Sequence, residues 1–130
     1  MKNNTKYQMS TSVNDGIIEV VLTGELMDNE AEKMINELIA IQKSTKANKQ
    51  ILDVRKLRKL LGIKETYDAL RNLPADRPKM KTAFVGNAEN ESYNFFVKAT
   101  ARNAGLIVNY FTDMEAARAW LKSKELDYYV

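Results

Sequence analysis

Two carboxylates stand where enzymes often place an acid or a base, at the ends of predicted strands. Asp53 follows the apolar residues 51–52, and Asp113 follows the run Val-Asn-Tyr-Phe at 108–111. Neither has a base, a nucleophile or a second carboxylate near it in sequence, and acids in such places commonly cap a loop or a helix start. The chain contains no histidine and no cysteine. A serine–histidine triad, a thiolate nucleophile, an iron–sulfur cluster and the usual transition-metal sites are therefore excluded, and we expect no catalytic residue, metal or cofactor.

A second set of residues suits binding. In an open α/β sheet, ligands meet the loops that follow the carboxyl ends of the parallel strands. Arg55 and Lys56 could face Asn87 there and hold a carboxylate or a phosphate. Two glutamates at residues 89 and 91 would oppose an incoming anion, and an ordinary capped loop is the alternative interpretation. The residues that we expect to contact a ligand or partner are Glu25, Arg55, Lys56, Leu57, Arg58, Asn87 and Phe95.

Two apolar features raise the same choice between core and partner surface. The segment 55–61, Arg-Lys-Leu-Arg-Lys-Leu-Leu, reads as a mobile loop whose leucines could line a groove, cover the sheet edge or pack on the core, and we favour the core for two of the three. Phe95 lies opposite the predicted buried face of its helix, beside Lys98 and Arg102. An exposed aromatic there favours a partner surface, and packing under a neighbouring loop is the alternative.

Charge is unevenly distributed along the chain. The 130 residues have a net charge of +3, yet segment 43–81 holds 12 basic and 4 acidic residues, a net of +8. Such a segment can attract nucleic acid, anionic lipid or an acidic protein, or it can be a solvated face. Tyr67 is its only aromatic residue, so stacking platforms for single-stranded nucleic acid are lacking and we do not expect nucleic-acid binding.

Length and hydropathy indicate one domain. Residues 1–130 suit a single domain with a core over about 7–122 and tails at 1–5 and 123–130, of which 126–130 could dock on a second subunit. No run of about 18 apolar residues predicts a membrane span, and the first residues lack the apolar segment of a secretory signal. We therefore expect a cytoplasmic protein.

Hydrophobic periodicity predicts alternating strands and helices. Strands are expected at 7–13 and 16–23, joined by the turn Asn14-Asp15-Gly16, and then at 49–55, 80–85 and 106–111. Helices are expected at 28–44 with Asp28 as N-cap, at 62–73 with Ile63 and Tyr67 inward, and at 90–104; a last helix has Thr112 and Glu115 as its capping box and Ala116 inward. The fold class is therefore α/β, with one mixed five-stranded sheet, four helices and an antiparallel first strand.

The order of these elements and several of their sequence motifs resemble those of the STAS domain. Val-Val-Leu-Thr-Gly-Glu-Leu at 20–26, then a helix and Gln-Ile-Leu-Asp-Val-Arg at 50–55 carry the resemblance. Lys-Thr-Ala-Phe-Val-Gly at 81–86 and the stretch 108–121 are similar to the SpoIIAA-like branch, which includes anti-sigma-factor antagonists and is related in fold to CRAL-TRIO lipid-binding domains.

The resemblance implies a fold and a tendency to bind proteins or apolar ligands. Anti-sigma antagonists switch through a serine at the start of the second helix, but the matching segment 53–62 contains no serine or threonine. The phospho-serine switch is therefore not carried over. We expect a non-catalytic binding or regulatory module of the STAS type that contacts a protein partner or forms a homodimer. A carrier of an apolar or anionic small ligand is the alternative, and a nucleic-acid-associated basic protein is a third.

Overall fold

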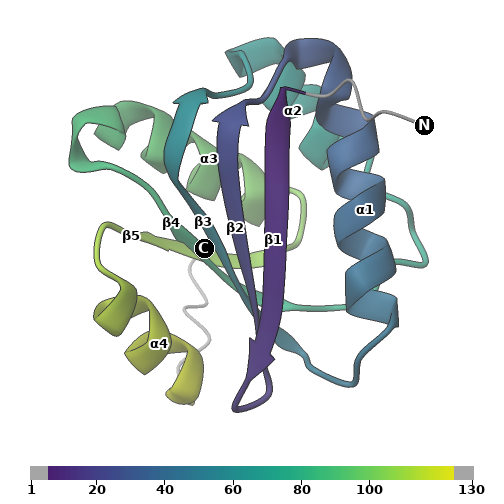
Figure 1. Cartoon of the computed structure of the whole chain (residues 1–130), viewed down its shortest axis with the longest axis vertical. Helices are drawn as coiled ribbons and strands as arrows, with labels where there is room; N and C mark the ends of the chain where they lie inside the picture. The colour runs from purple at the N-terminus through teal and green to yellow at the C-terminus, as the bar shows by residue number, and fades with distance from the viewer. Residues whose placement is uncertain (1–5, 125–130) are drawn as a thin grey trace.

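The computed structural model describes residues 6–124 and confirms the predicted fold class. Figure 1 shows a five-stranded sheet with helices on both sides. Its elements are β1 (Tyr7–Asn14), β2 (Ile17–Glu25), α1 (Ala31–Lys43), β3 (Lys49–Lys59), α2 (Ile63–Arg71), β4 (Lys81–Val85), α3 (Glu91–Asn103), β5 (Ile107–Phe111) and α4 (Met114–Lys122). The strands lie in the order β1-β2-β3-β4-β5; β1 pairs antiparallel with β2, and all other pairs are parallel. Of the predicted tails at 1–5 and 123–130, residues 1–5 and 125–130 lie outside the described residues.

The hairpin of β1 and β2 closes through the predicted tight turn. Asn14 pairs with Ile17, so the turn consists of Asp15 and Gly16 alone. Both have positive φ, 55° and 73°, as a type I′ turn requires. This turn matches the twist of the flanking strands, which fixes the antiparallel register of β1 on β2.

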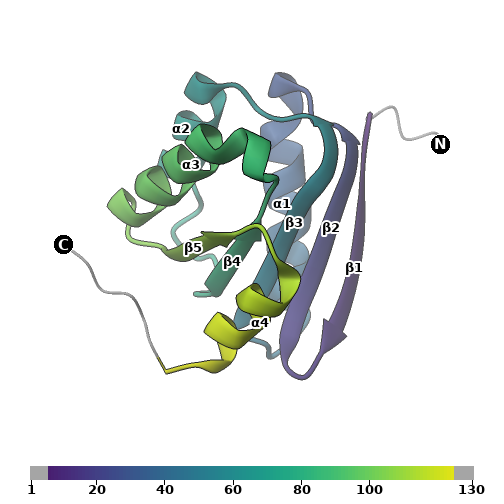
Figure 2. The ribbon, with the colours of Figure 1, turned by 90° about the vertical axis from the view of Figure 1, so that its left-hand side faces the viewer.

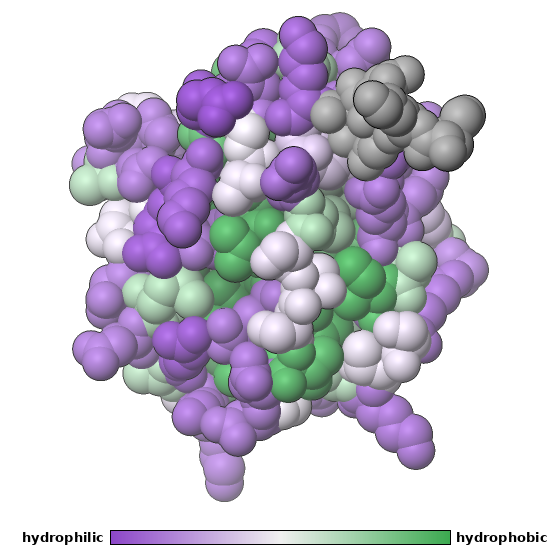
Figure 3. All heavy atoms as spheres, in the orientation of Figure 1, coloured by the Kyte–Doolittle hydropathy of each residue, from purple (hydrophilic) through white to green (hydrophobic). Residues whose placement is uncertain are grey.

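The sheet separates two layers of helices. Helices α1, α2 and α3 cover one face, and α4 covers the other (Figure 2). Alternate residues of the central strands point to opposite layers: in β4, Phe84 packs with Leu22 and Met34 toward α1–α3, whereas Val85 packs with Trp120 of α4. The edge strand β1 is mostly exposed, and the side on which it lies has apolar surface near its middle within a hydrophilic rim (Figure 3).

The third strand is longer than predicted, and segment 56–59 is not a loop. β3 continues to Lys59 and stays paired with β2 to Glu25, but its register shifts twice, so that one extra β3 residue is accommodated at each shift. Such β-bulges rotate the residues that follow to the other face. Four apolar residues therefore lie on the side of the sheet that α1–α3 cover, although the spacing between them changes from two residues to three: Leu52, Val54, Leu57 and Leu60. The sequence pattern alone suggested a break in the strand because it departs from period two.

Helix starts and buried faces differ from prediction in four places. The N-cap of α4 is Asp113, whose carboxylate accepts from the Ala116 N–H, so Thr112 is not the cap, and Ala116 itself is exposed. Asp28 begins a 3-10 turn, and its carboxylate accepts from the backbone N–H of Gly62 at 3.0 Å. In α2 the predicted inward residues are exposed, Ile63 by 56% and Tyr67 by 48%. Thr66 is buried instead, because α2 rests on α3 rather than flat on the sheet.

Candidate functional site

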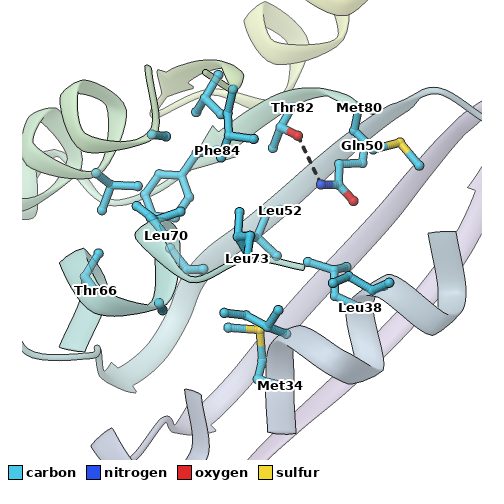
Figure 4. Close-up of a pocket in the computed structure, with 18 of the residues that line it drawn as sticks. Met34, Leu38, Gln50, Leu52, Thr66, Leu70, Leu73, Met80, Thr82 and Phe84 are labelled. Atoms are coloured by element: carbon cyan, nitrogen blue, oxygen red, sulfur yellow. Dashed lines mark hydrogen bonds between the residues drawn. The ribbon is translucent and has the colours of Figure 1, made fainter. Parts of the chain in front are cut away.

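A cavity of about 310 Å³ lies between the sheet and the helix layer α1–α3 (Figure 4). Its walls come from the helix-facing sides of β2–β5, from the three helices and from the segment between α2 and β4. Most lining side chains are aliphatic or aromatic, among them Met34, Leu38, Leu52, Leu70 and Phe84. Native cores rarely contain voids much larger than a water molecule, whereas pockets for small ligands begin near 300 Å³. The volume and lining therefore fit an apolar small molecule.

The leucines of segment 55–61 form part of this lining. Leu57 and Leu60 are half-buried and Leu61 is buried, and all three line the cavity and pack against the same core cluster. Because the two bulges of β3 turn these leucines toward the helices, the charged residues between them point away. The sequence predicts core contact for two of the three leucines, whereas all three pack on the core.

Hydrogen-bonded amides form a polar strip in the cavity wall. The Gln42 side-chain N–H donates to Gln50 Oε1 at 3.0 Å, and the Gln50 N–H donates to Thr82 Oγ1 at 3.0 Å. Gln42 and Gln50 are 6% and 5% exposed, so the strip is buried. Burying an amide group costs folding free energy unless the group is hydrogen-bonded, and the two hydrogen bonds of the strip offset part of this cost.

A second polar pair lies away from this strip. The hydroxyls of Thr66 and Tyr93 share a hydrogen bond of 2.9 Å, which ties α2 to α3. Burial raises the pKa of the Tyr93 phenol, and the hydrogen bond with Thr66 only partly offsets this rise. The phenol is therefore neutral at pH 7. Figure 4 shows Thr66 and the Gln50–Thr82 pair at opposite ends of the view, with Leu52, Leu70 and Leu73 between them. The middle of the cavity is thus apolar.

The cavity meets the surface near the segment between α2 and β4 and the start of β5, because its exposed lining residues, Lys79, Gly105 and Ile107, lie there. Half-buried Arg77 also lines the cavity, and it donates from Nη1 to the carbonyl oxygen of Pro74 at 3.0 Å, which restrains its side chain. Of the described residues that line the cavity, Arg77 and Lys79 are the only two with a charge.

The predicted anion-binding residues lie at the other end of the sheet, at the carboxyl ends of β3 and β4. The Arg55 guanidinium donates from Nε and Nη2 to the Asp53 carboxylate at 3.0 and 2.9 Å, and the Arg55 backbone N–H donates to Asp53 Oδ1 at 3.1 Å. The Asn87 amide donates to the Arg55 carbonyl oxygen at 2.8 Å. Arg55 and Asn87 are therefore brought together as predicted, but the Arg55 guanidinium is directed at Asp53.

Electrostatics at this corner favour a fixed ion pair. Burial alone would raise the pKa of Asp53, which is 5% exposed, but the hydrogen bonds and charge of Arg55 more than offset burial and lower the pKa below its usual range. The same contact raises the pKa of Arg55. Asp53 is thus a charged structural partner at pH 7, which leaves the Arg55 side chain less available to a ligand.

The remaining predicted residues are spread over the surface. Arg58 Nε lies 3.9 Å from Glu25 Oε2; the Arg58 side chain is largely exposed and the Glu25 side chain is half-buried. Lys56 is exposed, and Phe95, on α3, is 61% exposed, so it does not pack under a neighbouring loop. Lys43, Arg55, Arg58 and Lys64, all cations of the basic segment 43–81, each lie within 4 Å of a carboxylate. The role of these residues in binding stays a prediction.

Sequence reasoning did not single out the cavity residues Gln42, Thr66, Arg77, Lys79 and Thr82. The only local signal is a polar residue at a position that the periodicity assigns to the core, as at Gln42 in its helix. Arg77 and Lys79 lie between two prolines in a connection that looks like any solvated loop. Their convergence depends on how α2 and β4 are placed in space.

Within residues 6–124, no three histidine, cysteine, aspartate or glutamate side chains gather as a metal ion would need. None of the helices in this part of the chain is both long and apolar enough to cross a membrane.

Comparisons with known proteins bear on the fold. No protein-family model and no curated protein matches the sequence. Among solved structures, the chain is similar to an anti-sigma factor antagonist from Mycobacterium paratuberculosis, with 11% identity over 95% of this chain and 100% of that one and a TM-score of 0.63. It is also similar to an uncharacterized DUF3478-family protein from Shewanella loihica PV-4, described as having a SpoIIAA-like fold, with 17% identity over 93% and 98% of the two chains and a TM-score of 0.60. The resemblance drawn from the sequence is thereby confirmed at the level of architecture: this chain has the SpoIIAA-like α/β fold.

Proposed function

We propose that the protein is a non-catalytic binding module of the cytoplasm that holds a small, mainly apolar molecule in the cavity between the sheet and α1–α3. The observation that carries this proposal is the 310 Å³ volume with its aliphatic lining. A void of this size in a core would cost several kcal/mol in lost contacts. An apolar molecule that fills it recovers those contacts, at about 0.8 kcal/mol for each buried methylene.

The chemistry of the lining supports binding rather than a reaction. Among the described residues that line the cavity, the polar groups are amides, hydroxyls, a neutral phenol and two cations, without a carboxylate, thiol or imidazole. Those three are the commonest acid–base and nucleophilic groups, and a hydroxyl or an amine usually needs one of them beside it to become reactive.

The proposal is tested with a neutral fluorescent probe, N-phenyl-1-naphthylamine. Wild-type protein should bind one probe molecule saturably. Ala69→Phe adds a ring to the α2 wall of the cavity and should weaken binding at least tenfold. Ala116→Phe places the same ring on the exposed side of α4 and serves as the matched control with unchanged affinity. Absence of saturable binding to wild type, or equal affinity of Ala69→Phe and wild type, would contradict the proposal.

A second candidate function is regulation through a protein partner or a homodimer, as anti-sigma antagonists do but without a phospho-serine. The exposure of Phe95, 61% on a helix surface, favours it because exposed aromatics often anchor interfaces. Phe95→Ala should weaken self-association in sedimentation, or capture of a partner from the native cell, without lowering the melting temperature. Ile63→Ala, which truncates a similarly exposed residue on α2, is the control. A lower melting temperature of the Phe95→Ala monomer would instead identify a packing role.

A further inference from the structure

We infer that the molecule held in the cavity is a single-chain amphiphile with an anionic head group, and that the head group lies beside Arg77 and Lys79. This inference rests on the proposed function, because it names the ligand class for the same cavity. The head group would lie at the opening between α2 and β4, to which neither the sequence pattern nor the fold comparison assigns a role.

The charge of the opening has one sign. Arg77 and Lys79 are the only charged residues among the described ones that line the cavity, and both are cations. Neither has a carboxylate within ion-pair distance in residues 6–124. The nearest acid in sequence, Asp76, lies 3.2 Å from the ammonium of Lys43. Two cations without an acidic partner at the mouth of an apolar cavity complement a negative group and repel a positive one.

The polar strip next to the opening retains hydrogen-bond donors. Thr82 Oγ1 accepts from Gln50, so the Thr82 hydroxyl hydrogen is left to donate. Gln50 uses one of its two amide N–H groups on Thr82, which leaves the other as a second donor. The amide oxygen of Gln42 adds an acceptor to the strip, so the strip can serve either kind of polar group, and the two cations favour a negative one.

The rest of the cavity suits a hydrocarbon chain. Past the strip the wall is mainly aliphatic, and at the far end Thr66 and Tyr93 share a hydrogen bond. A hydrocarbon chain that ends there therefore leaves that hydrogen bond intact. Since one water takes about 30 Å³ and covalently joined carbon atoms take less each, the volume accommodates on the order of 10–15 non-hydrogen atoms, which corresponds to a medium-length chain.

The experiment measures displacement of N-phenyl-1-naphthylamine by three ten-carbon competitors that differ in the head group: decanoate, 1-decanol and decylammonium. Wild type should bind decanoate about tenfold more tightly than decanol and more tightly still than decylammonium, with the decanoate preference decreasing at high salt. The double variant Arg77→Gln/Lys79→Gln should lose about tenfold in decanoate affinity and change less than twofold for decanol.

Two further variants separate charge from folding. Lys79→Glu alters only an exposed side chain, and it should weaken decanoate and strengthen decylammonium. Lys122→Gln/Lys124→Gln removes two exposed charges from the region of α4, on the other side of the sheet, and should leave all three competitors unchanged.

The outcomes distinguish this inference from the proposed function. If the probe binds wild type but decanoate and decanol compete equally, or if the double variant retains wild-type affinity for decanoate, the anionic head group is refuted and the apolar cavity stands. If neither the probe nor any competitor binds wild type, the proposed function and the inference both fail.

Discussion

The ion pair between Asp53 and Arg55 gives a sharp test of the structure. Arg55→Met keeps the length of the side chain but removes both guanidinium hydrogen bonds to a carboxylate that is 5% exposed, and only the backbone N–H of residue 55 is left as a donor. Breaking a buried pair from one side costs about 3–5 kcal/mol. Because the Arg55 side chain is 37% exposed, we reduce the expected loss to about 2–3 kcal/mol of unfolding free energy.

Chemical and thermal unfolding at pH 7 measure this loss. For a chain of 130 residues, 1 kcal/mol corresponds to about 4 °C in melting temperature, so Arg55→Met should melt about 8–12 °C below wild type. Asp53→Asn is the matched control, because its neutral amide still accepts a hydrogen bond and the half-exposed arginine can turn to water. It should cost only about 1 kcal/mol.

The pH dependence has a defined sign. In wild type the pKa of Asp53 is lowered on folding, so its stabilisation is present above the unfolded pKa of about 3.9 and is lost as pH falls through the folded value. In Arg55→Met, burial without the guanidinium raises the Asp53 pKa, and protonation then relieves the buried charge. The deficit relative to wild type should therefore shrink between pH 7 and pH 4. A deficit below about 0.5 kcal/mol at pH 7, or one independent of pH, would refute the reasoning.

Three other substitutions probe the fold and the cavity wall. Gly24→Ala should lower the unfolding free energy by about 2–3 kcal/mol in urea titrations, because residue 24 has φ of +88° and an added Cβ would lie 2.3 Å from the Lys6 carbonyl oxygen. Lys81→Met should lower it by about 2 kcal/mol, since the buried ammonium donates to two carbonyls at the end of α4; near-ultraviolet circular dichroism of Trp120 should report that end loosening in parallel. Gln50→Leu should cost about 1–3 kcal/mol in thermal unfolding by leaving both of its side-chain partners unpaired, and wild-type stability would contradict the hydrogen-bonded strip.

Local sequence rules worked where one interaction dominates. The Asp15-Gly16 turn closes the predicted hairpin because positive φ at both positions selects a type I′ turn. These rules failed where more than one arrangement was open to the chain. Asp113 caps α4 although the neighbouring Thr112 also has a capping side chain. In α2, Tyr67 faces outward because the helix packs against α3. Periodicity in one segment contains no information about which neighbour that segment will meet.

In the candidate site, too, some contacts could be predicted from the sequence and others could not. Arg55 and Asn87 could be grouped in advance because carboxyl ends of adjacent parallel strands meet at one sheet edge. The bulges of β3 could not be predicted, since they depend on the pairing with β2. Only that pairing turns Leu57 and Leu60 inward.

By itself, the sequence determined the α/β architecture, the lack of histidine and cysteine chemistry and the missing hydroxyl in segment 53–62, because these follow from residue type and from short-range periodicity. Only the tertiary structure decided that Arg55 is directed at Asp53, that aliphatic side chains from four strands and three helices enclose 310 Å³, and that Arg77 and Lys79 lie at its opening. A cavity is a property of the space left between packed elements, and no single segment of the chain encodes its volume or the sign of the charge beside it.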